Sequence, residues 1–143
     1  MFRGLMIFSM FLICTFIGFF LGENYKRRSI QLKEFQKGLL LLSNEIIYAN
    51  TPLPDALMEV SKKVYNPISE ILNDMSFTLE NGYAGTIYES FEKAYMKSKE
   101  EMNLLDDDYK IISDFFKTLG SSGVTGQDKI FKIALDSIDI NYK

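Results

Sequence analysis

The chain opens with an unbroken apolar run, and the remainder alternates apolar and polar positions with a helical period. Residues 4–22 are nineteen positions without a charged side chain, and the basic cluster Lys26-Arg27-Arg28 follows shortly after them. Nineteen residues in a helix span roughly 28 Å, close to the roughly 30 Å hydrocarbon core of a bilayer. The pattern predicts a membrane-spanning anchor at residues 1–22 and a separate domain over residues 23–143.

A cleaved signal peptide is the other interpretation of the apolar run. The run is longer than the roughly 7–15 apolar residues typical of a signal peptide, and no clear cleavage site precedes Glu23. The sequence therefore favours an uncleaved single-pass anchor. Lys26, Arg27 and Arg28 act as topology determinants, because positive charge resists translocation. We expect the N-terminus outside the cell membrane and the following domain in the cytoplasm.

Apolar residues recur at spacings of three and four along residues 23–143, which predicts an all-α, compact bundle of about six helices. The first predicted helix can continue directly from the anchor. Its apolar stripe consists of Leu32, Phe35, Leu39, Leu42 and Ile46. Breaks at residues 51–54, 66–67 and 81–82 and a loop at residues 121–126 separate the later helices. No segment of useful length alternates with period two, so no sheet is expected.

Local signals predict how several helices begin and end. Thr51 is expected to cap the second helix, with Pro52 tolerated in its first turn. Thr86 with Glu89 fits a capping box at the start of the fourth. Asp106 is expected to cap the fifth helix and Gly120 to follow its last residue.

Composition limits the function classes. Residues 23–143 hold 15 basic and 19 acidic residues, a net charge of −4, which argues against a nucleic-acid-binding face. The chain has no histidine, the commonest general base and transition-metal ligand. Its single cysteine, Cys14, lies within the apolar run, so no intrachain disulfide is possible. We therefore expect no catalytic set, no cofactor and no metal site.

The one carboxylate cluster is Asp106-Asp107-Asp108. Three consecutive residues diverge around a helix start, whereas metal ligands must converge. Stabilisation of a helix N-terminus explains the cluster better. An enzyme that uses carboxylates or serines without histidine is therefore a disfavoured alternative.

Three segments together form a recognisable arrangement. They are Arg27-Arg28-x-x-Gln31-Leu32, then Leu39-x-x-Leu42-x-x-Glu45-Ile46-x-Tyr48-x-x-Thr51-Pro52-Leu53-x-x-Ala56, and finally Leu119-Gly120 followed by Gln127. With the N-terminal membrane helix, this arrangement resembles the stage III sporulation protein AB family over nearly the whole chain. Members of that family commonly continue into a second hydrophobic segment near the C-terminus, and this sequence holds none up to Lys143.

The resemblance implies a role in endospore formation, in the mother cell, within a channel complex that links mother cell and forespore. It also implies a soluble region similar to the cytoplasmic domain of platform proteins in type II secretion and type IV pilus machines. We therefore predict a non-enzymatic platform or scaffold subunit. Its partners would be the lipid bilayer and other channel subunits, including a cytoplasmic ATPase, but no nucleic acid or small-molecule substrate. The alternative is a membrane-tethered regulatory adaptor that binds one soluble cytoplasmic partner.

The expected partner interface consists of Glu45, Tyr48, Thr51, Pro52 and Gln127. Glu45 and Tyr48 lie three apart and can share one helix face, and neither leucine packing nor capping explains them. The pair either serves assembly or makes a local contact between the first two helices of the bundle. We expect this run to lie near enough to the membrane to contact both a motor and neighbouring membrane subunits.

Overall fold

The computed structural model describes residues 1–121 and 126–142, and these residues form six α-helices without a β-strand. The all-α prediction is therefore confirmed. The helices are α1 (Phe2–Ser43), α2 (Leu53–Ser61), α3 (Ile68–Glu80), α4 (Ile87–Lys97), α5 (Asp106–Ser121) and α6 (Gln127–Tyr142). A π-helical turn, η1 (Asn44–Tyr48), follows α1, and a 3₁₀ turn, η2 (Lys99–Glu101), follows α4. Most of the predicted loop at 121–126 lies outside the described residues.

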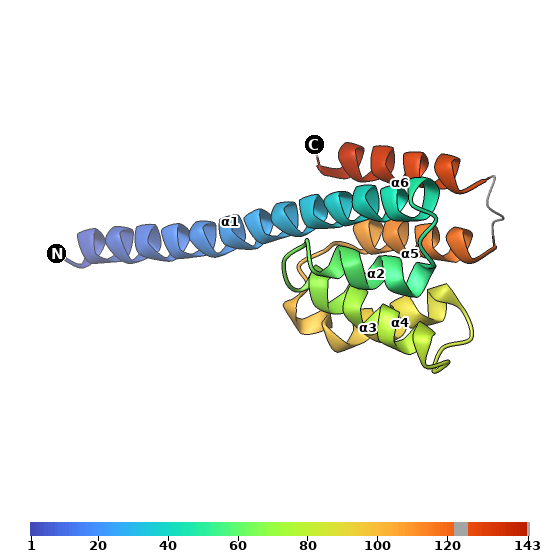
Figure 1. Ribbon diagram of the computed structural model, residues 1–143. Helices are drawn as coiled ribbons and strands as arrows, with labels where there is room; N and C mark the ends of the chain where they lie inside the picture. The colour runs from blue at the N-terminus through green and yellow to red at the C-terminus, as the bar shows by residue number, and fades with distance from the viewer. Residues whose placement is uncertain (122–125, 143) are drawn as a thin grey trace.

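Helix α1 joins the apolar run to the bundle without a break (Figure 1). Its apolar N-terminal half projects from the rest of the molecule, and Phe8, Phe11 and Phe16 are 64–80% exposed. Its C-terminal half contributes Leu32, Phe35, Leu39 and Leu42 to the core, each at most 2% exposed. By length and composition α1 can cross a membrane. The boundary between anchor and bundle at residue 22 stays a prediction, because the helix runs straight through it.

α6 and α2 lie along the C-terminal half of α1, on different sides of it (Figure 1). α2 runs back along α1, α3 and α4 extend the bundle beyond α2, and α6 returns along α1 towards the apolar half. Gly38 of α1 packs against α2 and α3, where a Cβ would meet Leu72 Cδ1 at 3.7 Å and Val60 Cγ1 at 3.9 Å, both ordinary contact distances. Stacked aromatic rings fill the centre, with Phe91 and Phe116 centroids 4.8 Å apart.

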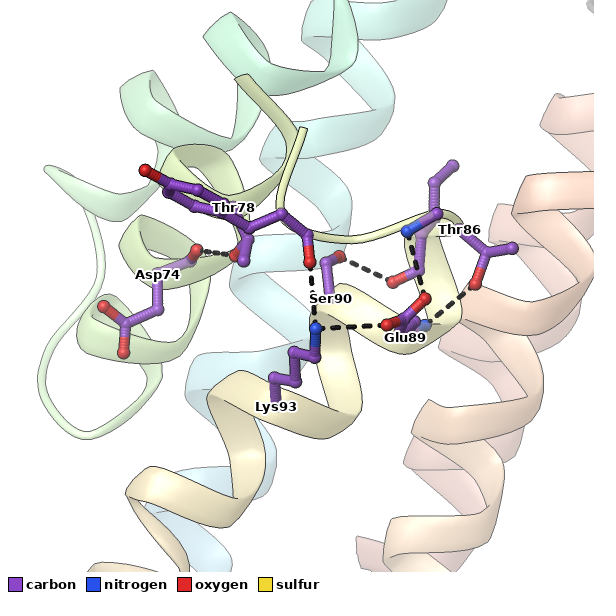
Figure 2. Close-up of polar contacts among 9 residues, drawn as sticks. Asp74, Thr78, Thr86, Glu89, Ser90 and Lys93 are labelled. Atoms are coloured by element: carbon purple, nitrogen blue, oxygen red, sulfur yellow. Dashed lines mark hydrogen bonds and ion pairs between the residues drawn. The ribbon is translucent and has the colours of Figure 1, made fainter. Parts of the chain in front are cut away.

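The corner between α3 and α4 follows local rules closely (Figure 2). Thr86 Oγ1 accepts the Glu89 N–H at 3.0 Å, which confirms the predicted cap. Glu89 Oε2 accepts the Gly85 N–H at 3.0 Å, one residue earlier than a standard capping box would have it. This hydrogen bond, and then the Lys93 ammonium, lower the pKa of the Glu89 carboxyl. Lys93 also donates to Tyr83 O at 2.9 Å and so ties the turn to α4.

Three other predicted helix ends are wrong in detail. Pro52, rather than Thr51, occupies the N-cap position of α2 and makes no side-chain cap. Asp106 is already the first residue of α5, and the Asp108 carboxylate instead accepts the Leu105 N–H at 3.0 Å. Gly120 lies within α5, which ends at Ser121. At the first two ends the hydroxyl or carboxylate bonds elsewhere: Thr51 to Glu45, and Asp108 to the Leu105 N–H.

Candidate functional site

The end of the bundle furthest from the apolar run carries most of the predicted interface. There η1 tightens the chain after α1, and Thr51 closes the corner by two hydrogen bonds to Glu45. The Thr51 N–H donates to Glu45 O and the Thr51 hydroxyl donates to Glu45 Oε2, both at 2.9 Å. Asn50 takes the left-handed conformation, with φ 55°, which asparagine tolerates better than most residues. We call residues 45–52 the distal corner.

Glu45 and Tyr48 differ in their surroundings although they are close in sequence. Glu45 is half-buried and bonded to Thr51, so its local contact explains why a carboxylate stands there. Tyr48 is 77% exposed, as a contact residue for another molecule would be. The two residues therefore differ in burial and in hydrogen bonding.

A groove beside the distal corner brings together residues of the second and third sequence segments described above. It has a volume of about 400 Å³, and its lining residues come from α2, α4, α5 and α6 as well as the corner itself. They are Ile46, Asn50, Thr51, Leu53, Ile87, Leu119, Gly120 and Gln127. Thr51 and Gln127 thus lie on one surface despite their separation in sequence. Pro52 is exposed at the start of α2.

The distal corner is remote from the predicted membrane span. Glu45 is 23 residues beyond Gly22 along a continuous helix, a distance of roughly 35 Å. The corner follows the end of α1 that is opposite the apolar run, because α1 carries the chain away from that run before the first turn. The expectation that this run lies near enough to the membrane to contact membrane subunits stays a prediction.

The opposite end of the bundle holds a polar cluster that sequence reasoning missed. Arg28 donates from Nε to Asp108 Oδ2 at 2.6 Å and from Nη2 to Asp108 Oδ1 at 2.9 Å. The Asp108 side chain is fully buried and that of Arg28 is 12% exposed. The hydrogen bonds to Asp108 raise the pKa of the Arg28 guanidinium. Such two-pronged pairing fixes direction as well as distance.

Gln31, one turn further along α1, completes this cluster. Its Nε2 donates to Glu101 O at 2.9 Å, and its Oε1 accepts the Asn103 N–H at 2.8 Å. Arg28 and Gln31 therefore tie α1 to the segment that leads into α5. The only sequence signal was their joint presence in the Arg27-Arg28-x-x-Gln31 motif.

The three residues expected to set topology occupy different environments. Lys26 and Arg27 are exposed, and Arg27 pairs with Glu23 at 3.0 Å on the helix surface. Arg28 is mostly buried in its pair with Asp108. Among the described residues no three His, Cys, Asp or Glu side chains converge as a metal site would require. Asp108 of the acidic cluster serves the ion pair instead.

The protein is an α-helical bundle whose first helix continues from an apolar stretch long enough to cross a membrane. A family model, stage III sporulation protein AB, matches residues 3–143, so the chain belongs to the stage III sporulation protein AB family. This confirms the resemblance inferred from the motif. The family places the protein in stage III of sporulation.

Two relatives agree with this assignment. The stage III sporulation protein AB of Bacillus subtilis (strain 168) is 27% identical over 125 residues, which cover 87% of this chain and 72% of the relative. A solved structure of stage III sporulation protein AB (SpoIIIAB) is 25% identical and superposes with a TM-score of 0.75. That match covers 82% of this chain and 92% of the solved chain.

Proposed function

We propose that this protein is a non-enzymatic platform or scaffold subunit of a sporulation channel complex that links mother cell and forespore. Residues 1–22 anchor it in the cell membrane, and residues 23–143 form a bundle in the mother-cell cytoplasm. Its partners are the other subunits of the complex, including a cytoplasmic ATPase. Membership of the sporulation family supports this proposal.

The observation that carries the proposal is the continuity of α1. The same helix is exposed and apolar at one end and supplies the bundle core at the other. A bundle packed on the anchor helix lies at a distance from the membrane that the length of α1 sets, because one continuous helix joins the two. A protein that only needed tethering would function with a flexible linker between anchor and domain.

The distal corner and its groove are the proposed partner surface. They lie at the end of the bundle furthest from the anchor, where a soluble partner has free access (Figure 1). Tyr48 and Gln127 offer a large aromatic side chain and an amide beside the partly apolar groove. Tyrosine is enriched among residues that dominate binding energy at protein interfaces.

The orientation of the anchor can be tested with single cysteines. We expect a cysteine placed at exposed Asn73 on α3, in a Cys14→Ser background, to resist an impermeant thiol reagent in intact cells and to react after lysis. The reason is that Lys26 and Arg27 keep the bundle in the cytoplasm. Phe2→Cys in the same background is the control and should react in intact cells. The reverse labelling pattern would contradict the proposed topology.

The partner surface can be tested by Tyr48→Ala. We expect a loss of about tenfold or more in co-purification of the cytoplasmic partner from sporulating cells, because truncating such a residue costs about 2 kcal/mol or more. The melting temperature should not change, since Tyr48 is 77% exposed. Ile140→Ala on α6 is a control of matched exposure, at 74%.

The same experiment separates the two proposed roles. For a platform, sporulation should stall and several subunits should be lost together with the soluble partner. A regulatory adaptor would lose one soluble partner and keep its membrane neighbours. Normal recovery of every partner with Tyr48→Ala would exclude the distal corner as the working interface.

A further inference from the structure

The bundle end nearest the apolar half of α1 carries a group of exposed lysines on one side. Lys26 and Lys37 lie on one face of α1, with exposed Ile30 between them, and Lys62 and Lys63 lie where α2 ends. We call these four lysines, together with Tyr65, the basic face. Figure 1 shows the α2–α3 connection reaching towards the apolar half of α1.

Specific contacts hold the α2–α3 connection against α1. The Tyr65 N–H donates to Glu34 Oε2 at 2.9 Å, and the Lys37 Nζ lies 5.8 Å from the centre of the Tyr65 ring. Val64 is 7% exposed and packs where α1 has Gly38. Tyr65 itself is 74% exposed. The lysines and the aromatic ring are thus presented by an ordered segment.

The four lysines of this face have two carboxylates near them, Glu34 beside Tyr65 and Glu59 beside Lys62, so the face keeps a net positive charge. Lys62 has an exposed ion pair with Glu59 at 3.1 Å, and such pairs are weak in water. Within the described part of the chain, Lys26, Lys37 and Lys63 form no ion pair. The face is therefore available to an external anion.

The other side of the same end is acidic. Glu100 and Glu101 in η2 and Asp106 and Asp107 at the start of α5 are all exposed. The bundle as a whole carries a net charge of −4, so the basic face is a local concentration against the overall sign. An anionic surface would attract the basic face and repel the η2–α5 edge. The bundle would therefore tilt towards the membrane on the side of the basic face.

Geometry decides which lysines reach a lipid surface. Lys26 is four residues beyond Gly22 and Lys37 is fifteen, or roughly 6 Å and 22 Å along α1. Electrostatic attraction falls off within a Debye length of about 8–10 Å. With α1 upright Lys26 would lie within that range and Lys37 would lie beyond it. Leaning towards the α2–α3 connection brings Lys62, Lys63 and Tyr65 to the surface as well.

We propose that the basic face binds the headgroups of anionic phospholipids in the membrane that holds the anchor. The bundle leans so that the α2–α3 connection rests on the lipid, Tyr65 enters the interfacial layer, and the η2–α5 edge stays away from it. Tyrosine is favoured at this depth because one end of its ring is apolar and the other polar. The inference rests on the proposed anchor and adds the orientation of the bundle on the membrane.

The test uses the full-length protein, which has no tryptophan, so Tyr65→Trp supplies a single fluorescent reporter. The protein is inserted into vesicles of brominated phosphatidylcholine, with or without phosphatidylglycerol. We expect a blue shift and stronger quenching when phosphatidylglycerol is present, both reversed by added salt. Tyr48→Trp at the distal corner is the control and should respond to neither lipid.

A charge-reversal pair makes the test specific. Lys62→Glu with Lys63→Glu should abolish the phosphatidylglycerol response, since each lysine near an anionic surface contributes roughly fivefold to binding. Lys129→Glu with Lys132→Glu on α6 makes the same change of net charge at exposed positions and should leave the response intact. Equal effects of the two double variants would overturn the proposal.

Flotation with pure phosphatidylcholine vesicles separates this proposal from the anchor. If the protein floats with those vesicles but the reporter ignores phosphatidylglycerol, the anchor stands and the basic face does not bind lipid. If the protein floats with neither vesicle type, the predicted membrane anchor is refuted, and the proposed tilt of the bundle on the membrane is refuted with it.

Discussion

Phe116→Ala is expected to lower the free energy of unfolding by about 3–5 kcal/mol, the usual cost of truncating a buried phenylalanine. The Phe116 side chain is fully buried at the centre of the bundle. Its ring centroid lies 4.8 Å from that of Phe91 and 5.0 Å from that of Phe115. The cavity left by truncation would therefore open between α4 and α5, beside the rings of Phe91 and Phe115.

Phe77→Ala on α3 is the matched control, because Phe77 is 57% exposed. Its truncation should cost less than about 1 kcal/mol, as for most surface substitutions. Urea unfolding of the full-length protein in detergent, followed by circular dichroism, measures both variants. Similar losses at the two positions would mean that the aromatic cluster is not the core of the bundle.

Hydrophobic periodicity predicts that the chain is helical and which residues of a helix face the core, but not where each helix ends. Of the predicted stripe on the first helix, Leu32, Phe35, Leu39 and Leu42 are at most 2% exposed, and Ile46 is partly buried against the core. This works because a helix in a bundle must bury its apolar face, and the period of 3.6 residues determines which residues share that face. The rule is local and holds whichever helix lies opposite.

Contacts between distant residues could not be predicted by the same reasoning. Arg28 and Asp108 are 80 residues apart, and each had a sufficient local explanation: topology for Arg28 and the helix N-terminus for Asp108. Periodicity does not say which helices are neighbours, so it could not bring the two together. The groove that both Thr51 and Gln127 line could not be predicted from the sequence for the same reason.

The distal corner shows a different limit of sequence reasoning. The rule that threonine before proline caps a helix placed Thr51 at the N-cap of α2. The π-helical turn η1 brings Glu45 within reach of Thr51. The Thr51 hydroxyl therefore donates to the Glu45 carboxylate and does not cap α2. Turns of this kind have weak sequence signals and are frequent at functional sites.

The second large effect is expected at the ion pair that fixes the bundle to α1. Asp108→Ala should lower the free energy of unfolding by about 3–5 kcal/mol, because it leaves the mostly buried Arg28 without its partner. The Leu105 N–H would also lose its acceptor. Arg27→Met is the control on the neighbouring residue. Its exposed pair with Glu23 should contribute no more than about 1 kcal/mol.

The double variant Arg28→Met with Asp108→Leu distinguishes the cost of an orphaned charge from the value of the pair itself. Apolar replacement of both partners of a buried pair is often neutral or stabilising, so urea unfolding should give a stability near that of the parent protein. In that case the pair serves to fix how the other helices are oriented on α1. The Tyr65→Trp reporter should then show a changed blue shift and changed quenching on anionic vesicles. A double variant as unstable as Asp108→Ala alone would instead show that the pair supplies stability that apolar packing cannot replace.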